Sequence, residues 1–341
     1  MVNRMIPSAR AYLLVAAACI FLVATVPSAG SAEKLKIAIP ALASELAPYW
    51  IAVDRGFFKA EGLEVELPLI IGNTRGVQAL LAGEVQGGIG GAASPVAAVV
   101  QGSKIVVVEV EKNVMDFILA TREPIKTPSE LADKKFGVSS LGSSSHVATL
   151  MALRELGVDP SRATMLQVGG AASRIAAIKN GSVFAAAVSG TVFAGRGKEF
   201  GLYKVIDLAE KGTDYPYSCL YVTSRYAAEN RRTVLGVIRA LVKGIRFYYA
   251  NKDESVNITA RHFRNPDKEV LSREWDFVTR TKLFQELPYP TKQGFDALFK
   301  GMAVDNPKIA SLRMEEVVDL SFLDQLSKEG FFKQAGDKQS R

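Results

Sequence analysis

The feature that most constrains the fold is a regular alternation of short apolar segments and amphipathic segments that begins at residue 34. The apolar segments have the length and the boundaries of strands: "KLKIAIPAL" (34–42), "LEVELPLI" (63–70), "QGGIGG" (86–91) and "KIVVVEV" (104–110). The segments between them predict three helices, which span residues 47–62, begin after residue 72 and begin at Ser94. Gly62, Gly83 and Gly102 are their stop signals, and the third helix has Ser94 as its expected N-cap and Pro95 as its first residue. This β-α-β-α-β order predicts a mainly parallel sheet with crossover helices.

A second unit of the same kind starts near residue 127. Its expected strands are "KFGVSS" (135–140), "ATMLQV" (163–168) and "VFAAAVSG" (183–190), and its expected helices are "SSHVATLMALRELG" (144–157) and "ASRIAAIKNG" (172–181). Residues 74–91 and 173–190 echo each other, because both open with a hydroxyl residue and Arg and both end in a small-residue strand. The echo fits two similar lobes, and it also fits a chance likeness of two helix–strand units. From residue 229 onward the chain reads as mostly helical, and a chain of 341 residues is long enough for two α/β lobes.

The first 32 residues have the pattern of an export signal rather than of a folded element. Arg4 and Arg10 form a basic start, "AYLLVAAACIFLVATV" is an apolar core, and "PSAGSA" offers small residues for cleavage after Ala32. We therefore expect a cleaved signal peptide over residues 1–32 and a periplasmic product. Cys19 follows small residues and leaves lipidation open as an alternative, although Ala16 stands where lipoproteins usually have Leu. Cleavage would leave Cys219 as the single cysteine, so no internal disulfide is expected.

The charge of the chain argues against nucleic acid as a partner. The formal net charge is +7, but lysines and arginines are spread along the chain without the clusters and interleaved aromatic residues that nucleic-acid binding requires. We therefore interpret the excess as a solvated basic surface.

The segment "SSLGSSSHVA" (139–148) raises the question of catalysis, since serines stand beside one of the two histidines of the chain. A serine hydrolase needs a base near its nucleophile and a third group that orients the base, and neither that arrangement nor a G-x-S-x-G elbow is recognisable. Metal-ligand spacings are missing around both histidines, and "GIGGAA" (88–93) lacks the setting of a dinucleotide fingerprint. The pattern favours a chain without catalytic activity or cofactors.

The same residues fit a binding role without any special chemistry. Small and hydroxyl residues follow the predicted strands at "ASEL" (43–46), "GNT" (72–74), "GGAAS" (90–94), "SSLGSSSH" (139–146), "GGAAS" (169–173) and "SGT" (189–191). Loops at the carboxyl ends of parallel strands are where open α/β sheets bind ligands, and helix N-termini offer backbone N–H groups there. The occurrence of "GGAAS" in both units favours one shared site over six unrelated turns.

The order of these motifs resembles the nitrate/sulfonate/taurine family of ABC-transporter substrate-binding proteins. The resemblance rests on "YWIAVDRGFFKAEGLEVEL", "ALLAGEVQGGIGG" and "AAVVQG", and it extends over roughly residues 34–330. It implies a type II periplasmic binding protein, in which two α/β lobes joined by two crossing segments close on a small solute and deliver it to a membrane permease. Lobe one would be residues 33–120 and 220–341, and lobe two residues 121–219. Such a protein is expected to act as a monomer.

The family's binding positions fall on the loops described above. The candidate ligand-binding residues are Ser44, Glu45, Asn73, Thr74, Ala92, Ser94, Ser140, Ser143, Ser144, Ser145, Gly170, Ser189 and Thr191. Glu45 would repel a purely anionic ligand, and Arg75 and Arg174 stand one residue inside helices rather than in a loop. Nitrate or sulfonate specificity therefore does not follow, and the expected ligand is a small organic or anionic solute. Tyr49, Trp50 and Tyr217 can serve either as ligand-packing or as core aromatic residues.

Two further functions remain open on the same fold. Thiamine-pyrimidine precursor synthases share it, but they imply an iron-binding cysteine cluster that one cysteine cannot supply. A ligand sensor that contacts a signalling receptor would have the same sequence features as a transport protein.

Overall fold

A computed structural model of the chain describes residues 32–212, 214–263, 267–303 and 306–333. The predicted signal peptide, including Cys19, lies outside these residues except for Ala32. From Glu33 onward the chain forms one compact unit built on two sheets.

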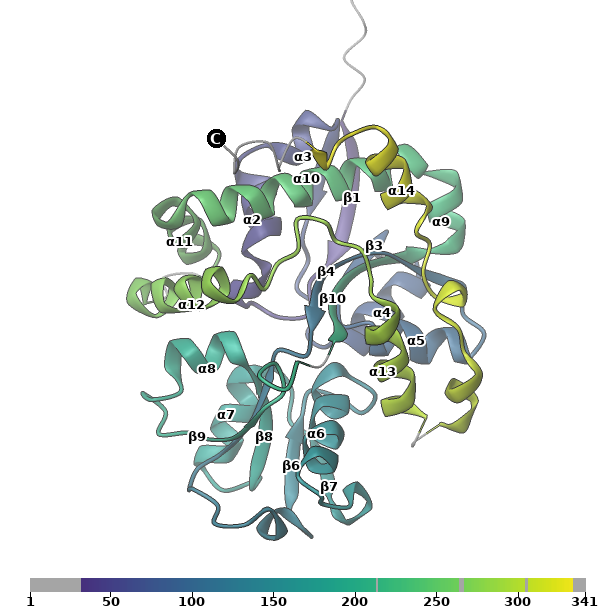
Figure 1. Cartoon of the computed structure of the whole chain (residues 1–341). Coiled ribbons are helices and arrows are strands. Elements are labelled where there is room, and N and C mark those ends of the chain that lie inside the picture. The colour runs from purple at the N-terminus through teal and green to yellow at the C-terminus, as the bar shows by residue number, and fades with distance from the viewer. Residues whose placement is uncertain (1–31, 213, 264–266, 304–305, 334–341) are drawn as a thin grey trace, which may run out of the picture. The chain divides into compact units, whose positions relative to one another are not determined.

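The first sheet has five strands in the order β2-β1-β3-β10-β4 (Figure 1). The strands are β1 (Glu33–Ala38), β2 (Leu63–Glu66), β3 (Gly87–Gly90), β4 (Ile105–Val114) and β10 (Asp214–Thr223). β1 pairs in parallel with β2 and β3, whereas β10 runs antiparallel to both β3 and β4. Four strands thus share one direction, as the sequence predicts, and β10 returns from the second sheet to run against them.

The second sheet repeats this order as β7-β6-β8-β5-β9. Its strands are β5 (Phe117–Thr121), β6 (Lys135–Val138), β7 (Thr164–Gln167), β8 (Ala185–Ser189) and β9 (Tyr203–Asp207). β6 pairs in parallel with β7 and β8, and β5 runs antiparallel to β8 and β9. The predicted fold class, two mainly parallel sheets flanked by helices, is confirmed.

Three loops in each sheet lead from a strand into a helical element. In the first sheet they lead to 3₁₀-helix η1 (Ser44–Leu46) followed by α2 (Ala47–Asp54), to α4 (Asn73–Leu81) and to α5 (Ala93–Val100). In the second sheet they lead to α6 (Ser144–Glu155), α7 (Ala171–Lys179) and α8 (Gly190–Arg196). The echoing segments 74–91 and 173–190 are α4–β3 and α7–β8, which occupy equivalent places in the two sheets.

Two helix predictions need correction. The single helix expected over 47–62 is two helices, α2 and α3 (Phe57–Ala60), because Gly56 adopts a left-handed conformation with φ of 70° between them. Ser94 is not an N-cap: α5 has Ala92 as its N-cap, and Ser94 lies inside the first turn.

The remaining elements are helical, as predicted, and most of them cover the first sheet. They are η2 (Pro128–Leu131), η3 (Pro160–Arg162), α9 (Ser224–Glu229), α10 (Arg231–Ala250), α11 (Lys252–His262), α12 (Lys268–Thr281), α13 (Lys292–Met302), η4 (Pro307–Ser311), η5 (Met314–Glu316) and α14 (Ser321–Lys328). The apolar face of α10 buries Val234, Ile238, Leu241 and Ile245 in a core cluster that also contains Trp50. Among the described helices, none has the length and hydropathy that crossing a membrane requires.

Candidate functional site

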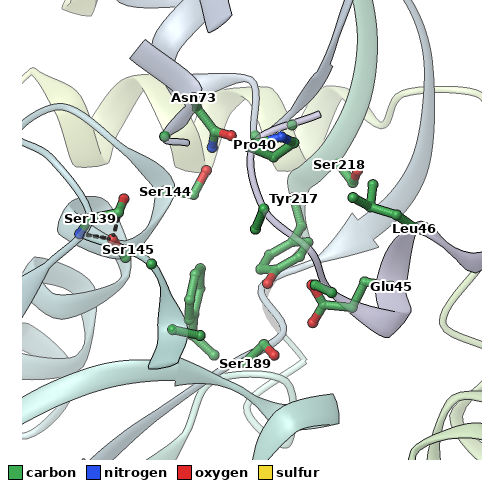
Figure 2. A pocket seen from close by; sticks show the side chains of 18 of the residues that line it. Pro40, Glu45, Leu46, Asn73, Ser139, Ser144, Ser145, Ser189, Tyr217 and Ser218 are labelled. Atoms are coloured by element: carbon green, nitrogen blue, oxygen red, sulfur yellow. Dashed lines mark hydrogen bonds between the residues drawn. The ribbon is translucent and has the colours of Figure 1, made fainter. Parts of the chain in front are cut away.

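A cavity of about 130 Å³ lies where the loops of the first sheet face those of the second (Figure 2). Loops that follow β1, β2 and β3 contribute Ala43, Asn73 and Gly91, and loops that follow β6, β7 and β8 contribute Ser139, Gly170 and Ser189. The walls therefore come from all six strand-to-helix loops. This arrangement follows from the topology, because the carboxyl ends of parallel strands lie at one edge of each sheet.

Six of the thirteen candidate residues line this cavity. They are Glu45, Asn73, Ser144, Ser145, Gly170 and Ser189. Figure 2 shows Glu45, Asn73, Ser144, Ser145 and Ser189 around the pocket with Tyr217. Whether each of them contacts a ligand stays a prediction.

The other seven candidates lie behind the wall or beside it, and they are Ser44, Thr74, Ala92, Ser94, Ser140, Ser143 and Thr191. Thr74 Oγ1 is 3.2 Å from Ser140 Oγ and 3.4 Å from Ser94 Oγ, so these three hydroxyls bridge the two sheets. Thr191 Oγ1 donates to Asp116 Oδ2 at 3.2 Å, and Ser44 faces a neighbouring chamber.

The serine-rich loop 139–146 is held by its own hydrogen bonds. Ser143 is the N-cap of α6, and its hydroxyl accepts the backbone N–H of His146 and donates to the Ser140 carbonyl at 2.7 Å. Ser145 Oγ accepts the backbone N–H of Ser139 at 2.9 Å. His146 Nδ1 accepts the N–H of Gly142 at 3.1 Å, which gives the histidine a structural contact inside the loop. These bonds hold the serine hydroxyls and His146 in place within the loop.

Lys112 brings a buried positive charge to the cavity, and the sequence reasoning missed it. Its side chain is 1% exposed, and Nζ lies 3.9 Å from Glu45 Oε1 and 3.8 Å from Asp116 Oδ2. Within the described part of the chain, Nζ finds no hydrogen-bond acceptor. A buried ammonium without a hydrogen-bond acceptor costs free energy. A ligand that accepts a hydrogen bond from Lys112 Nζ removes this cost and therefore binds more tightly.

Asp116, one of the two acids beside Lys112, has a raised pKa. Burial raises the pKa of Asp116 to about 7, an effect that nearby Lys112 opposes and Glu45 reinforces. Asp116 Oδ1 is buried and has no hydrogen-bond partner among the described residues. Near neutral pH the charge of the cavity therefore changes with the protonation of Asp116.

Arg174 supplies a second cation from the other sheet, against the expectation that its place inside a helix would turn it away. It lines the cavity at 5% exposure. Its Nε donates to the Ala187 carbonyl at 2.9 Å and its Nη1 to the Gly169 carbonyl at 2.8 Å, which fixes the guanidinium. Burial lowers the pKa of Arg174 to about 10, so it stays charged at neutral pH. Arg75, by contrast, is exposed.

Aromatic and polar groups of the crossing strands complete the wall. The Tyr217 ring centroid is 4.5 Å from Lys112 Nζ and 5.1 Å from the Phe117 ring. Ser218 donates to Glu111 Oε1 at 2.6 Å, and burial raises the pKa of Glu111 and of neighbouring Glu109. Tyr49 and Trp50 are core residues of the first sheet rather than wall residues.

The missed residues share a place in the chain that loop patterns do not mark. Lys112, Phe117 and Ser218 lie on β4, β5 and β10, the strands that connect the sheets. Tyr217 of β10, for which the sequence left ligand packing and core packing open, lines the cavity beside them. The signal was present in "EVEKNVMD" (109–116), where charged residues interrupt an apolar strand. Buried charges in a strand need partners or a function. Among the described residues, no group of three or more His, Cys, Asp or Glu side chains is placed to hold a metal ion.

Comparison with known proteins gives a family and a fold. The sequence profile of NMT1/THI5-like proteins matches residues 43–255, which is more than half of the chain. No curated protein sequence matches the chain.

Solved structures share the fold at low identity. The ligand-binding component of an ABC-type import system from Staphylococcus aureus is 15% identical, with a TM-score of 0.70 over 86% of this chain and 98% of its own. The alkanesulfonate-binding protein SsuA from Xanthomonas axonopodis pv. citri, bound to MOPS, is 17% identical, with a TM-score of 0.70 over 84% and 98%. The desulfurization enzyme DSZB is 14% identical, with a TM-score of 0.62 over 87% and 99%. Together with the profile match, the binding proteins support the family resemblance predicted from sequence.

Proposed function

Since this chain belongs to the NMT1/THI5-like family, we propose that it is an extracytoplasmic solute-binding protein of an ABC importer. It captures a small organic anion between its two sheets and delivers the anion to a membrane permease. Neighbours of the same fold that are named as import or sulfonate-binding proteins support this role. The signal-like residues 1–32 support a periplasmic location. We propose that the chain acts as a monomer.

The observation that carries the proposal is a pair of buried cations that the two sheets contribute to one cavity. Lys112 comes from β4 of the first sheet and Arg174 from α7 of the second. A ligand whose negative charge is shared by both would hold the sheets together, which is how a two-lobed receptor couples binding to closure. Glu45 does not exclude an anion here, because its carboxylate is 3.9 Å from the Lys112 ammonium.

The proposed lobes are residues 33–120 with 220–341, and residues 121–219, so their boundaries fall within β5 and β10. Their connections run through β4 to β5 and β9 to β10, next to the cavity. Small-angle scattering should therefore show compaction when a saturating ligand is added. An unchanged radius of gyration at saturation would count against a hinge.

A catalytic function is the competing proposal, and the DSZB neighbour is its support. We favour binding because His146 and the serines around it are joined to one another by loop hydrogen bonds. Turnover of an ester by the purified chain, lost in the His146→Asn variant, would contradict the binding role and support a catalytic function.

The proposal is tested by a thermal-shift screen over sulfonates, carboxylates, nitrate and pyrimidines. A ligand present at about 100 times its Kd stabilises the folded chain by roughly 2.7 kcal/mol, a readily visible shift. We expect organic anions to give this shift and neutral pyrimidines to give none. A shift with pyrimidines alone would contradict an anion-binding function.

The Lys112→Gln variant tests the site itself. Loss of a charged hydrogen bond costs about 1.5–3 kcal/mol, so the affinity for the anion found in the screen should fall roughly 10- to 150-fold. Lys59→Gln, at an exposed lysine away from the cavity, is the matched control and should leave the affinity unchanged. Equal affinities in both variants would place the anion elsewhere.

A further inference from the structure

A second, larger chamber opens beside the cation-lined cavity. Its volume is about 780 Å³, compared with about 130 Å³ for the inner cavity. The two chambers share Ala41, Ala43, Gly170, Ala171 and Val192 as wall residues, so they are contiguous. An inner cavity of this size suits a compact charged group, whereas pockets for whole organic ligands measure about 300–1,000 Å³.

The wall of the outer chamber is mostly apolar. Three of the seven large apolar side chains that the described residues leave exposed line it, namely Leu42 at 45%, Leu69 at 44% and Ile71 at 51%. Ile175, Phe200 and Phe263 face it from helices and loops across the chamber. Exposed apolar side chains usually stand singly on a protein surface, so their gathering around one chamber beside the binding cavity indicates an apolar occupant.

We propose that the ligand is an amphipathic organic anion, whose charged group lies between Lys112 and Arg174 and whose apolar body fills the outer chamber. This inference rests on the proposed binding function and narrows its ligand class. Nitrate and other inorganic anions would leave the outer chamber unfilled. Short polar organic anions would bind weakly for the same reason.

Glu274 and Arg196 lie on the wall of the outer chamber together with Lys179. Glu274 is 5% exposed, and its raised pKa of about 7, caused mainly by burial, makes the outer wall less acidic at neutral pH than its composition suggests. The outer wall therefore does not oppose the approach of an anion with an apolar body.

The test is a calorimetric titration with two series of linear monoanions, the n-alkanoates from acetate to decanoate and the n-alkanesulfonates from ethane- to decanesulfonate. Each methylene that enters the chamber should raise the affinity about fourfold, the equivalent of about 0.8 kcal/mol per buried CH₂. The rise should stop when the chain fills the chamber.

Two variants test whether the outer chamber causes the rise in affinity with chain length. Ile71→Ser should reduce the gain per methylene, because it removes an apolar wall residue whose side chain is solvent-exposed and not needed for folding. Leu81→Ser is the matched control, since Leu81 is 47% exposed and lies outside the chamber, and it should keep the full gain. A reduced gain in both variants would contradict the assignment.

The outcomes separate this inference from the function beneath it. Binding of the whole series with equal affinity would overturn the apolar subsite and leave anion capture intact. Binding of no member, short or long, would overturn both. A full rise with chain length together with undiminished affinity in Lys112→Gln would show that the apolar chamber binds amphiphiles without the inner cavity, and it would overturn the arrangement proposed here.

Discussion

The two sheets have the same strand order but stabilise their loops in different ways. In the second sheet the loops before α6 and α8 end in serines, Ser143 and Ser189, whose hydroxyls accept a backbone N–H of the helix. In the first sheet the equivalent positions are Ala43 and Ala92, and neither provides a side-chain cap. In these two loops of the second sheet, a serine of the loop thus bonds a backbone N–H group at the start of the following helix. Each sheet contributes one buried cation to the cavity, Lys112 from the first and Arg174 from the second.

The strand interiors differ in a complementary way. Tyr221 of β10 lies opposite Gly88 of β3 in the first sheet, whereas Ala120 of β5 lies opposite Ala186 of β8 in the second. The first sheet thus pairs a large side chain with a glycine at this position, whereas the second sheet pairs two alanines. The two sheets therefore have the same strand order but distribute side-chain volume differently between the paired strands.

We expect the largest effect on stability from giving position 88 of the first sheet a side chain. A Cβ there would lie 2.5 Å from atoms of the buried Tyr221 ring, so Gly88→Ala should destabilise the chain by about 1–3 kcal/mol. Urea unfolding measures the change. Ala186→Gly, the converse change in the second sheet, should cost only about 0.5–1 kcal/mol. A larger loss for Ala186→Gly than for Gly88→Ala would break the comparison.

The next effect concerns the caps. Ser143→Ala removes the N-cap of α6 and should cost about 1 kcal/mol of stability. Ser94→Ala should cost less, because Ser94 lies within α5, and its hydroxyl has only a 3.4 Å contact with Thr74. Melting temperatures of the two variants make the comparison, and equal losses would mean that the caps are not what distinguishes the loops.

The smallest effect is on the pH dependence of binding. Asp116 is faced by Lys112 from β4, Glu45 from η1 and Asp207 from β9. Because its pKa is raised to about 7, protonation below that pH removes a negative charge near the cavity. Anion affinity should rise roughly two- to tenfold from about pH 8 to about pH 6, as expected for a partly screened charge several ångströms away.

Asp116→Asn should remove this pH dependence and hold the affinity near its low-pH value. Stability gives a second readout. The folded chain keeps a proton on Asp116 that the unfolded chain releases above pH 3.8, so this group lowers stability as pH rises from about 4 to about 7. The variant should lose less stability over that window. An unaltered pH profile of binding and of stability would show that Asp116 does not titrate there.

The sequence predicts those features of the structure that depend on residues close together in the chain. The alternation of strands and helices, the six loops and the cap at Ser143 depend on neighbouring residues, and their patterns are visible in the chain. The break between α2 and α3 at Gly56 is also local. It was not predicted because a single glycine is tolerated within a helix and does not by itself mark a break. The N-cap expected at Ser94 lies two residues too late in the sequence, because Ala92 begins the helix without a side-chain cap.

The charges of the site could not be predicted in the same way, because they depend on long-range pairing. Lys112 reaches the cavity only because β4 and β10 pair far apart in sequence, with Ser218 opposite Lys112. Arg174 reaches it because its guanidinium turns back to the carbonyls of Gly169 and Ala187. The two "GGAAS" segments, which suggested one shared site, follow the non-equivalent strands β3 and β7 and still line the same region.

A crystal structure of the chain with the anion identified in the screen tests the central claim most directly. The account predicts one ligand whose charged group lies within hydrogen-bond distance, about 2.7–3.2 Å, of both Lys112 Nζ and the Arg174 guanidinium. The ligand would then contact the first and the second sheet at once. A ligand that contacts side chains of only one sheet, or that binds away from both cations, would contradict it.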